Sequence, residues 1–180
     1  MPSSKPELDV WDSCCIIGIL NAEKEKLPAL LAQTRFFEAG SSILGIPSCA
    51  VTEVVTLADG TSAHSKVEEF LNNPYVQLLL PTREVSTLSA RLQYRFNTKQ
   101  IPDLREKAIK AGVPKDRASK LTSRDSEVLA TALFYKADRL STYDPFLIFL
   151  GREYIQRESA LVIDYPTSPF LPFPDAEGKS

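Results

Sequence analysis

Hydrophobic and polar positions along the chain form two patterns, short apolar runs and longer amphipathic stretches. The short runs predict five strands, at residues 8–11, 42–47, 75–81, 140–143 and 159–165. The amphipathic stretches predict helices at residues 13–23, 28–38, 48–58, 62–73, 126–136 and 146–158, and residues 86–121 are predicted to be mostly helical, with breaks near 102 and at 112–114. Strands that alternate with helices are typical of a parallel or mostly parallel sheet. We therefore expect an α/β fold.

The two ends of the chain differ from the segment between them. The chain has 180 residues, 43% of them hydrophobic, which suits one domain with a substantial core. Residues 1–7 are predicted to form a disordered N-terminus and residues 8–165 the folded domain. Four prolines occur within nine residues after Tyr165, so residues 166–180 are predicted to form a Pro-rich C-terminal tail of polyproline type or without order.

Composition excludes several kinds of protein. The formal net charge of -2 does not indicate a nucleic-acid or membrane partner, and three cysteines with one histidine do not suit a disulfide framework or a zinc site. The longest apolar run, residues 14–20, is too short to span a bilayer, and acidic residues precede it, unlike a secretory signal. We expect a cytoplasmic protein that does not contact a membrane.

Two aspartates directly follow predicted strands. Asp12 comes after the first strand and Asp144 after the fourth. Ligands of open α/β sheets bind beyond the carboxyl ends of the strands, so both positions suit a site. Aspartate is also a good helix N-cap, and Pro145 suits the first helical position, so capping alone also explains each residue, and for Asp144 taken by itself it is the favoured explanation.

Two further acids stand on predicted helices. If Ser48 caps its helix, Glu53 shares a face with three apolar residues, Ala50, Val54 and Leu57. Asp125 completes a capping box with Thr122, and it also heads the apolar face of its helix. Each residue again has a purely structural explanation, a solvated glutamate and a cap.

The four acids together favour a metal site. Carboxylates that converge repel one another and raise each other's pKa values, and a divalent cation removes that repulsion. Carboxylate oxygens without histidine or thiolate favour Mg²⁺ or Mn²⁺.

In chain order, these motifs resemble those of PIN domains, which are metal-dependent ribonucleases and include the toxins of virulence-associated protein C type. The motifs are Asp12 with Ser13, Glu53 in SCAVTEVV, Asp125 in RDSEVLATAL, and Thr142-x-Asp144. The resemblance covers residues 8 to about 165 and implies a three-layer α/β/α sandwich with a central, mostly parallel sheet. It also implies one or two Mg²⁺ or Mn²⁺ ions held by the four acids, support from Ser13 and Thr142, and an RNA substrate. For a toxin, it adds an antitoxin partner and a homodimer.

A basic segment leads to Asp125. Between residues 91 and 124 there are ten basic and three acidic residues, a charge of +7, which leaves -9 for the rest of the chain. We predict RNA-binding roles for Arg91, Arg95, Lys99 and Arg124, with Tyr94 or Phe96 available to stack on a base. A solvated helix face is the alternative explanation.

Three functions remain open from the sequence. The first is a metal-dependent ribonuclease that acts on single-stranded or structured RNA. The second is a PIN-like module that binds RNA or protein with little activity. The third is another magnesium enzyme, such as a haloacid-dehalogenase-like phosphatase, although Asp12-Ser13-Cys14 lacks the second aspartate of that family.

Overall fold

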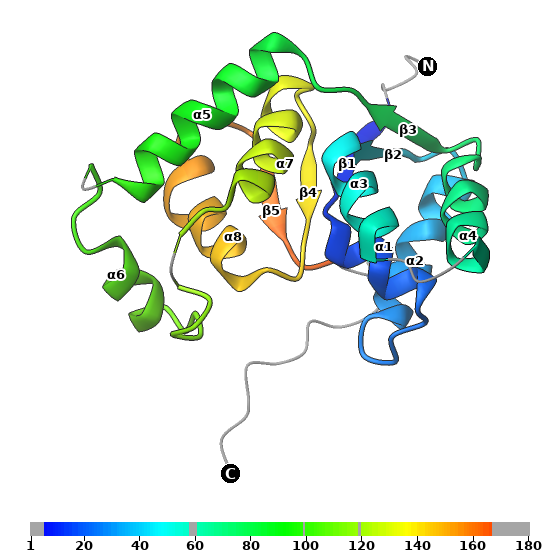
Figure 1. Ribbon diagram of the computed structural model, residues 1–180, viewed down its shortest axis with the longest axis horizontal. Helices are drawn as coiled ribbons and strands as arrows, with labels where there is room; N and C mark the ends of the chain where they lie inside the picture. The colour runs from blue at the N-terminus through cyan, green and yellow to red at the C-terminus, as the bar shows by residue number, and fades with distance from the viewer. Residues whose placement is uncertain (1–5, 58–60, 99, 119, 167–180) are drawn as a thin grey trace.

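The structure, a computed structural model, describes residues 6–57, 61–98, 100–118 and 120–166. Figure 1 shows its helices arranged around a central sheet. Residues 1–5 of the predicted N-terminal segment and residues 167–180 of the predicted Pro-rich tail lie outside the described residues.

The sheet has five strands, and each neighbouring pair is parallel. The strands are β1 (Glu7–Trp11), β2 (Ser42–Pro47), β3 (Val76–Leu79), β4 (Arg139–Ser141) and β5 (Val162–Asp164). Their order is β3-β2-β1-β4-β5. All five predicted strands are present, and the first begins one residue early, at Glu7, which pairs with Ser42.

The helices follow the predicted order. They are α1 (Ser13–Leu20), α2 (Leu27–Glu38), α3 (Ser48–Leu57), α4 (Thr61–Leu71), α5 (Arg83–Asn97), α6 (Leu104–Lys110), α7 (Ser123–Phe134) and α8 (Pro145–Leu150), and α8 continues into the π-helical turn η1 (Gly151–Ile155). Helix α7 begins three residues earlier than the apolar pattern suggests, because Thr122 caps it. Within the described residues, no helix has both the length and the apolar character needed to cross a bilayer.

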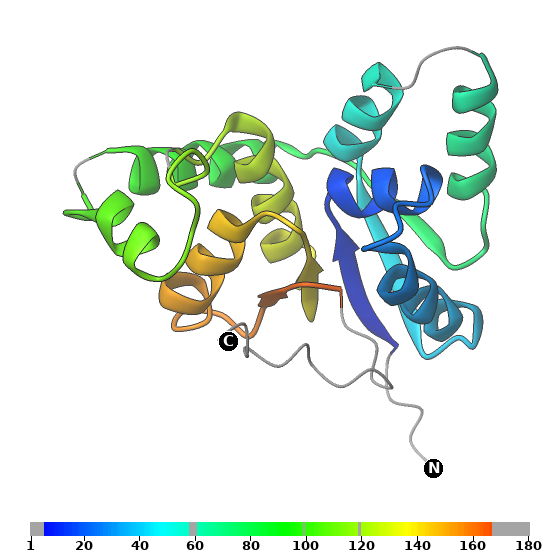
Figure 2. The ribbon, with the colours of Figure 1, turned by 90° about the horizontal axis from the view of Figure 1, so that it is seen from below.

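Two separate buried clusters cover the two faces of the sheet. Successive side chains of a strand point to opposite faces, so neighbours on β1 belong to different clusters. Trp11 packs among buried residues of α1 to α4, whereas Val10 packs among buried residues of α5 to α8. Figure 2 shows the helices of these two groups, blue to teal and green to orange, on opposite sides of the molecule. The predicted α/β/α sandwich is therefore confirmed.

The two layers diverge between β1 and β4. These strands are neighbours although most of the chain separates them. Helix α1 follows β1 into one layer, and α8 follows β4 into the other. A place where successive connections leave toward opposite faces is where open α/β sheets bind ligands. Asp12 lies there, and its backbone N–H donates to the Ser141 carbonyl oxygen of β4 at 3.1 Å.

Candidate functional site

Asp12 is buried at the end of β1, where it caps α1. Its exposed fraction is 7%. Oδ1 accepts a hydrogen bond from the backbone N–H of Ser13 at 2.7 Å, and Oδ2 accepts one from the hydroxyl of Thr142 at 2.9 Å. The Cys14 thiol also donates to Oδ2, at 3.4 Å. Burial raises the pKa of the Asp12 carboxyl, although the Thr142 hydrogen bond opposes this effect. None of these donors carries a charge, so none of them neutralises the carboxylate.

The Thr142 hydroxyl joins Asp12 to Asp144. Thr142 is fully buried after β4; it donates to Asp12 and accepts from the backbone N–H of Asp144 at 3.0 Å. Asp144 caps α8, because its Oδ1 accepts from the backbone N–H groups of Phe146 and Leu147 at 2.7 and 3.1 Å. Burial raises the pKa of the Asp144 carboxyl, against those two hydrogen bonds. Two of the predicted acids are thus linked through one predicted supporting residue.

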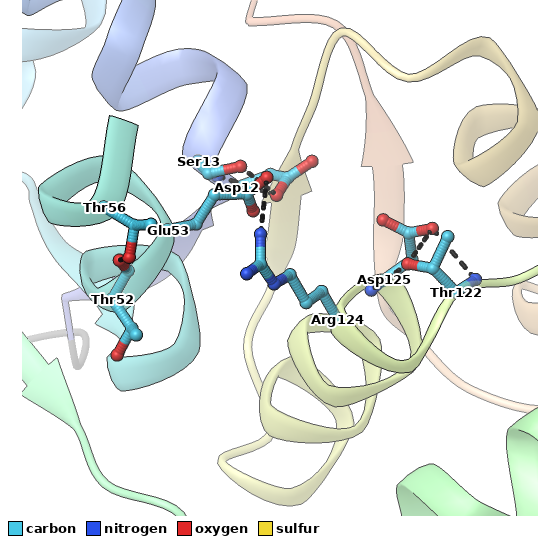
Figure 3. Close-up of polar contacts among 8 residues, drawn as sticks. All are labelled: Asp12, Ser13, Thr52, Glu53, Thr56, Thr122, Arg124 and Asp125. Carbon is cyan, nitrogen blue, oxygen red and sulfur yellow. Dashed lines mark hydrogen bonds and ion pairs between the residues drawn. The ribbon is translucent and has the colours of Figure 1, made fainter. Parts of the chain in front are cut away.

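Asp125 forms the predicted capping box at the start of α7. Its N–H donates to the Thr122 hydroxyl at 3.1 Å, while Oδ2 accepts from the Thr122 N–H at 3.1 Å and from the Thr122 hydroxyl at 2.6 Å (Figure 3). The preceding segment is held by Asn97 of α5, whose amide bonds both backbone groups of Leu121, at 2.7 and 2.9 Å. Sequence reasoning missed Asn97, because nothing local distinguishes it from a solvated helix end.

Asp125 acts electrostatically on two of the other acids. The charge of Asp125 raises the pKa of the Asp12 carboxyl and also that of the Asp144 carboxyl. The Arg117 guanidinium lowers the pKa of Asp144, as the smallest of the effects on that group. Asp12, Asp125 and Asp144 therefore lie within one electrostatic neighbourhood at the diverging edge of the sheet.

Glu53 faces the same region from α3 but has a cationic partner. Its Oε1 lies 3.2 Å from Nη1 of Arg124, which reaches across from α7 (Figure 3). Ala50 and Val54, predicted to share a helix face with Glu53, are buried, whereas Leu57 is 63% exposed. Leu57 is exposed because α3 ends at that residue, at the margin of the core.

The predicted RNA-binding residues fall into different environments. Arg95 makes a two-pronged ion pair with Glu158, with Nη1 2.7 Å from Oε2. Phe96 is buried in the core and packs edge-on against Tyr154, so it is not available to stack on a base. Lys99 lies outside the described residues.

Arg91 and Tyr94 lie on the outward side of α5. Tyr94 is 62% exposed. Both residues line a shallow groove, together with Arg83, Ser86, Thr87, Ala90 and Gln100. The groove contains two arginines and no acid, so it can meet a phosphate backbone with an aromatic ring beside it.

Asp9, on β1, is a second buried acid, which sequence reasoning did not single out. It accepts hydrogen bonds from the Ser141 hydroxyl at 2.9 Å and from the Gln33 amide at 3.3 Å. Burial raises the pKa of Asp9 to about 7, against the Ser141 hydrogen bond and the charge of Arg139. The sequence signal that could have identified Asp9 is a charged residue inside an otherwise apolar strand.

The four acids have the oxygen atoms that a divalent cation prefers, but their side chains are too far apart to bind one together. As the side chains stand, no three His, Cys, Asp or Glu residues of the described chain are close enough together to hold a metal ion. Two of the three capping acids, Asp125 and Asp144, nevertheless bond the backbone through one oxygen each, Oδ2 and Oδ1 respectively, whereas Asp12 accepts hydrogen bonds on both oxygens. Capping and metal binding are therefore compatible at Asp125 and Asp144, because each of these two carboxylates has a second oxygen.

Comparisons with known proteins support the fold. No family model and no curated protein matches the sequence. A chain of the VapBC2 complex of Rickettsia felis, solved bound to a DNA fragment from their promoter, has a TM-score of 0.53 at 12% identity, over 88% of this chain and 98% of that one. VapC20 of Mycobacterium tuberculosis, a toxin that cleaves the sarcin-ricin loop, has a TM-score of 0.50 at 14% identity, over 79% and 95%. The PIN-like fold predicted from the motifs is confirmed.

Proposed function

We propose that the chain is a divalent-metal-dependent ribonuclease. One observation carries this proposal: Asp12 and Asp144 are linked through Thr142 where the sheet diverges, and the charge of Asp125 raises the pKa of both. A cluster of like charges that includes a buried carboxylate is stabilised by a cation, and oxygen ligands favour Mg²⁺ or Mn²⁺. The fold similarity to VapC20, a toxin that cleaves the sarcin-ricin loop, supports a cleavage reaction.

The residues that would hold one or two metal ions are Asp12, Glu53, Asp125 and Asp144. A bound ion would lower the pKa of a water ligand and stabilise charge that develops on the scissile phosphate. Ser13 and Thr142 position the Asp12 carboxylate through its two oxygens. The capping box orients Asp125 on α7. This chemistry requires no side-chain nucleophile.

The chain's own cations would bind the substrate. Arg91 and Tyr94 in the α5 groove supply a phosphate contact and an exposed ring. Arg124 lies beside the acids, whereas Arg95 must first leave Glu158. The similarity to a chain of the VapBC2 complex supports a toxin role with an antitoxin protein as partner. A homodimer and a cytoplasmic location stay predictions.

The test is cleavage of labelled RNA, single-stranded and structured, by the purified chain with Mn²⁺ or with chelator. We expect metal-dependent cleavage that Asp144→Asn nearly abolishes. Asparagine caps helices as well as aspartate does, so this variant keeps the start of α8. Asp116→Asn, at an exposed loop carboxylate, is the matched control and should cleave normally.

Two results would overturn the proposal. RNA binding without cleavage at any metal concentration would favour a binding module. Metal-dependent hydrolysis of an aryl phosphate, with RNA left intact, would favour a phosphatase.

A further inference from the structure

The Glu53–Arg124 ion pair joins the two layers at the candidate site. Glu53 comes from α3 and Arg124 from α7, and the distance between Oε1 and Nη1 is 3.2 Å (Figure 3). Of the four acids, Glu53 is the one that pairs with a cationic side chain among the described residues. The Arg124 guanidinium therefore pairs with a carboxylate that the proposed metal ion would need as a ligand.

The position of Arg124 on α7 does not explain its charge. Thr122 is the N-cap and Asp125 the third helical residue, so Arg124 is the second residue of the helix. The N-terminus of a helix carries partial positive charge, which disfavours a basic side chain in the first turn. Arg124 thus gains nothing from its own helix, and its favourable interaction is with Glu53.

The pair is exposed enough to exchange partners. The side chains of Arg124 and Glu53 are 53% and 27% exposed. Ion pairs of this kind contribute little free energy because water screens them. A divalent ion that carries two charges and binds several carboxylates can therefore displace the arginine.

We propose that Arg124 is an internal counter-cation that competes with the divalent metal ion for Glu53. This inference rests on the proposed function. In the metal-free protein, Arg124 neutralises one of four like charges, so it stabilises the fold without metal and weakens metal binding. Glu53 can give its carboxylate to only one of the two cations at a time.

The test is isothermal titration of the full chain with Mn²⁺. Arg124→Gln should bind Mn²⁺ about two to five times more tightly than wild type, the range that a partly exposed ion pair supplies. Without metal, the same variant should melt at a lower temperature than wild type. Unchanged or weaker Mn²⁺ binding by Arg124→Gln would overturn the inference.

Two controls separate competition from the loss of a positive charge. Arg152 and Asp164 form a comparable ion pair at the end of β5 that involves none of the four acids, 2.9 Å apart with exposed fractions of 56% and 25%, so Arg152→Gln should leave Mn²⁺ affinity unchanged. Adding Arg124→Gln to Glu53→Gln should also change nothing. An arginine effect that persists without Glu53 would overturn the inference. If wild type binds no Mn²⁺ at all, the proposed function fails as well.

Discussion

Two aspartates, Asp9 on β1 and Asp12 directly after it, are equally buried but have different neighbours. Asp9 and Asp12 are 8% and 7% exposed. Each accepts a hydrogen bond from a buried hydroxyl of the β4 segment, Ser141 for Asp9 and Thr142 for Asp12. Asp9 lies within the strand, on the face that α2 covers through Gln33. Asp12 lies at the carboxyl edge, within the electrostatic reach of Asp125.

The difference teaches that burial alone does not make a site. Burial raises the pKa of both carboxyls, and that of Asp9 reaches about 7. The surroundings of Asp9 suit a neutral acid, because Oε1 of Gln33 has no hydrogen-bond partner among the described residues and a protonated carboxyl can donate to such an acceptor. Asp12 instead shares its surroundings with other carboxylates, so a cation can stabilise them together.

The largest expected effect separates the two aspartates by activity. Asp12→Asn should slow RNA cleavage by at least about 100-fold, because loss of a metal ligand should exceed the usual 10–100-fold effect of its supporting residues. Asp9→Asn should cleave at close to the wild-type rate. Initial rates at equal Mn²⁺, with near-ultraviolet circular dichroism to check folding, measure this. If Asp12→Asn and Asp9→Asn both fold and lose activity equally, the proposed difference between a metal ligand and a structural aspartate is wrong.

The second prediction concerns pH and stability. Because the folded-state pKa of Asp9 is raised from 3.8 to about 7, the folded protein binds more protons than the unfolded chain between these values. Stability should therefore fall as pH rises through that interval, by on the order of 4 kcal/mol from this group. Asp9→Asn should remove this part of the fall. Urea unfolding of both proteins from about pH 4 to pH 8 measures it, and an identical pH dependence would show that Asp9 titrates normally.

Much of this arrangement could be predicted from local sequence. Short-range patterns predict the order of strands and helices along the chain, the capping box at Thr122, and the positions of Asp12 and Asp144 at strand ends. The Glu53–Arg124 pair could not be predicted, because it joins residues 71 positions apart through the packing of α3 on α7.

The misassigned residues have the same cause. Phe96 was expected near the substrate and lies in the core, because the opposite faces of α5 meet water and α7, and the basic pattern alone does not say which face is which. Arg95 forms an ion pair with Glu158, which follows η1 and is distant in the sequence. Tertiary packing determined both outcomes.

A smaller effect should follow from the two hydroxyls that support the aspartates. Thr142→Val should slow cleavage by about 10-fold, because supporting hydrogen bonds orient a metal ligand. Ser141→Ala should leave cleavage unchanged but raise the pKa of Asp9 further, since the lost hydrogen bond lowers it. Cleavage rates and carboxyl titration by nuclear magnetic resonance measure the two effects. Slower cleavage in Ser141→Ala alone would reverse the assignment of the two hydroxyls.

Whether the acids at the carboxyl edge form one metal site is tested most directly by melting with and without Mn²⁺. At about a hundredfold excess over the dissociation constant, binding should stabilise wild type by about 2.7 kcal/mol, or roughly 5–10 °C. Asp9→Asn should show the same rise, Asp12→Asn should show less than half of it, and chelator should reverse it in each protein. No rise in wild type, or an equal rise in Asp12→Asn, would contradict a metal site built on Asp12.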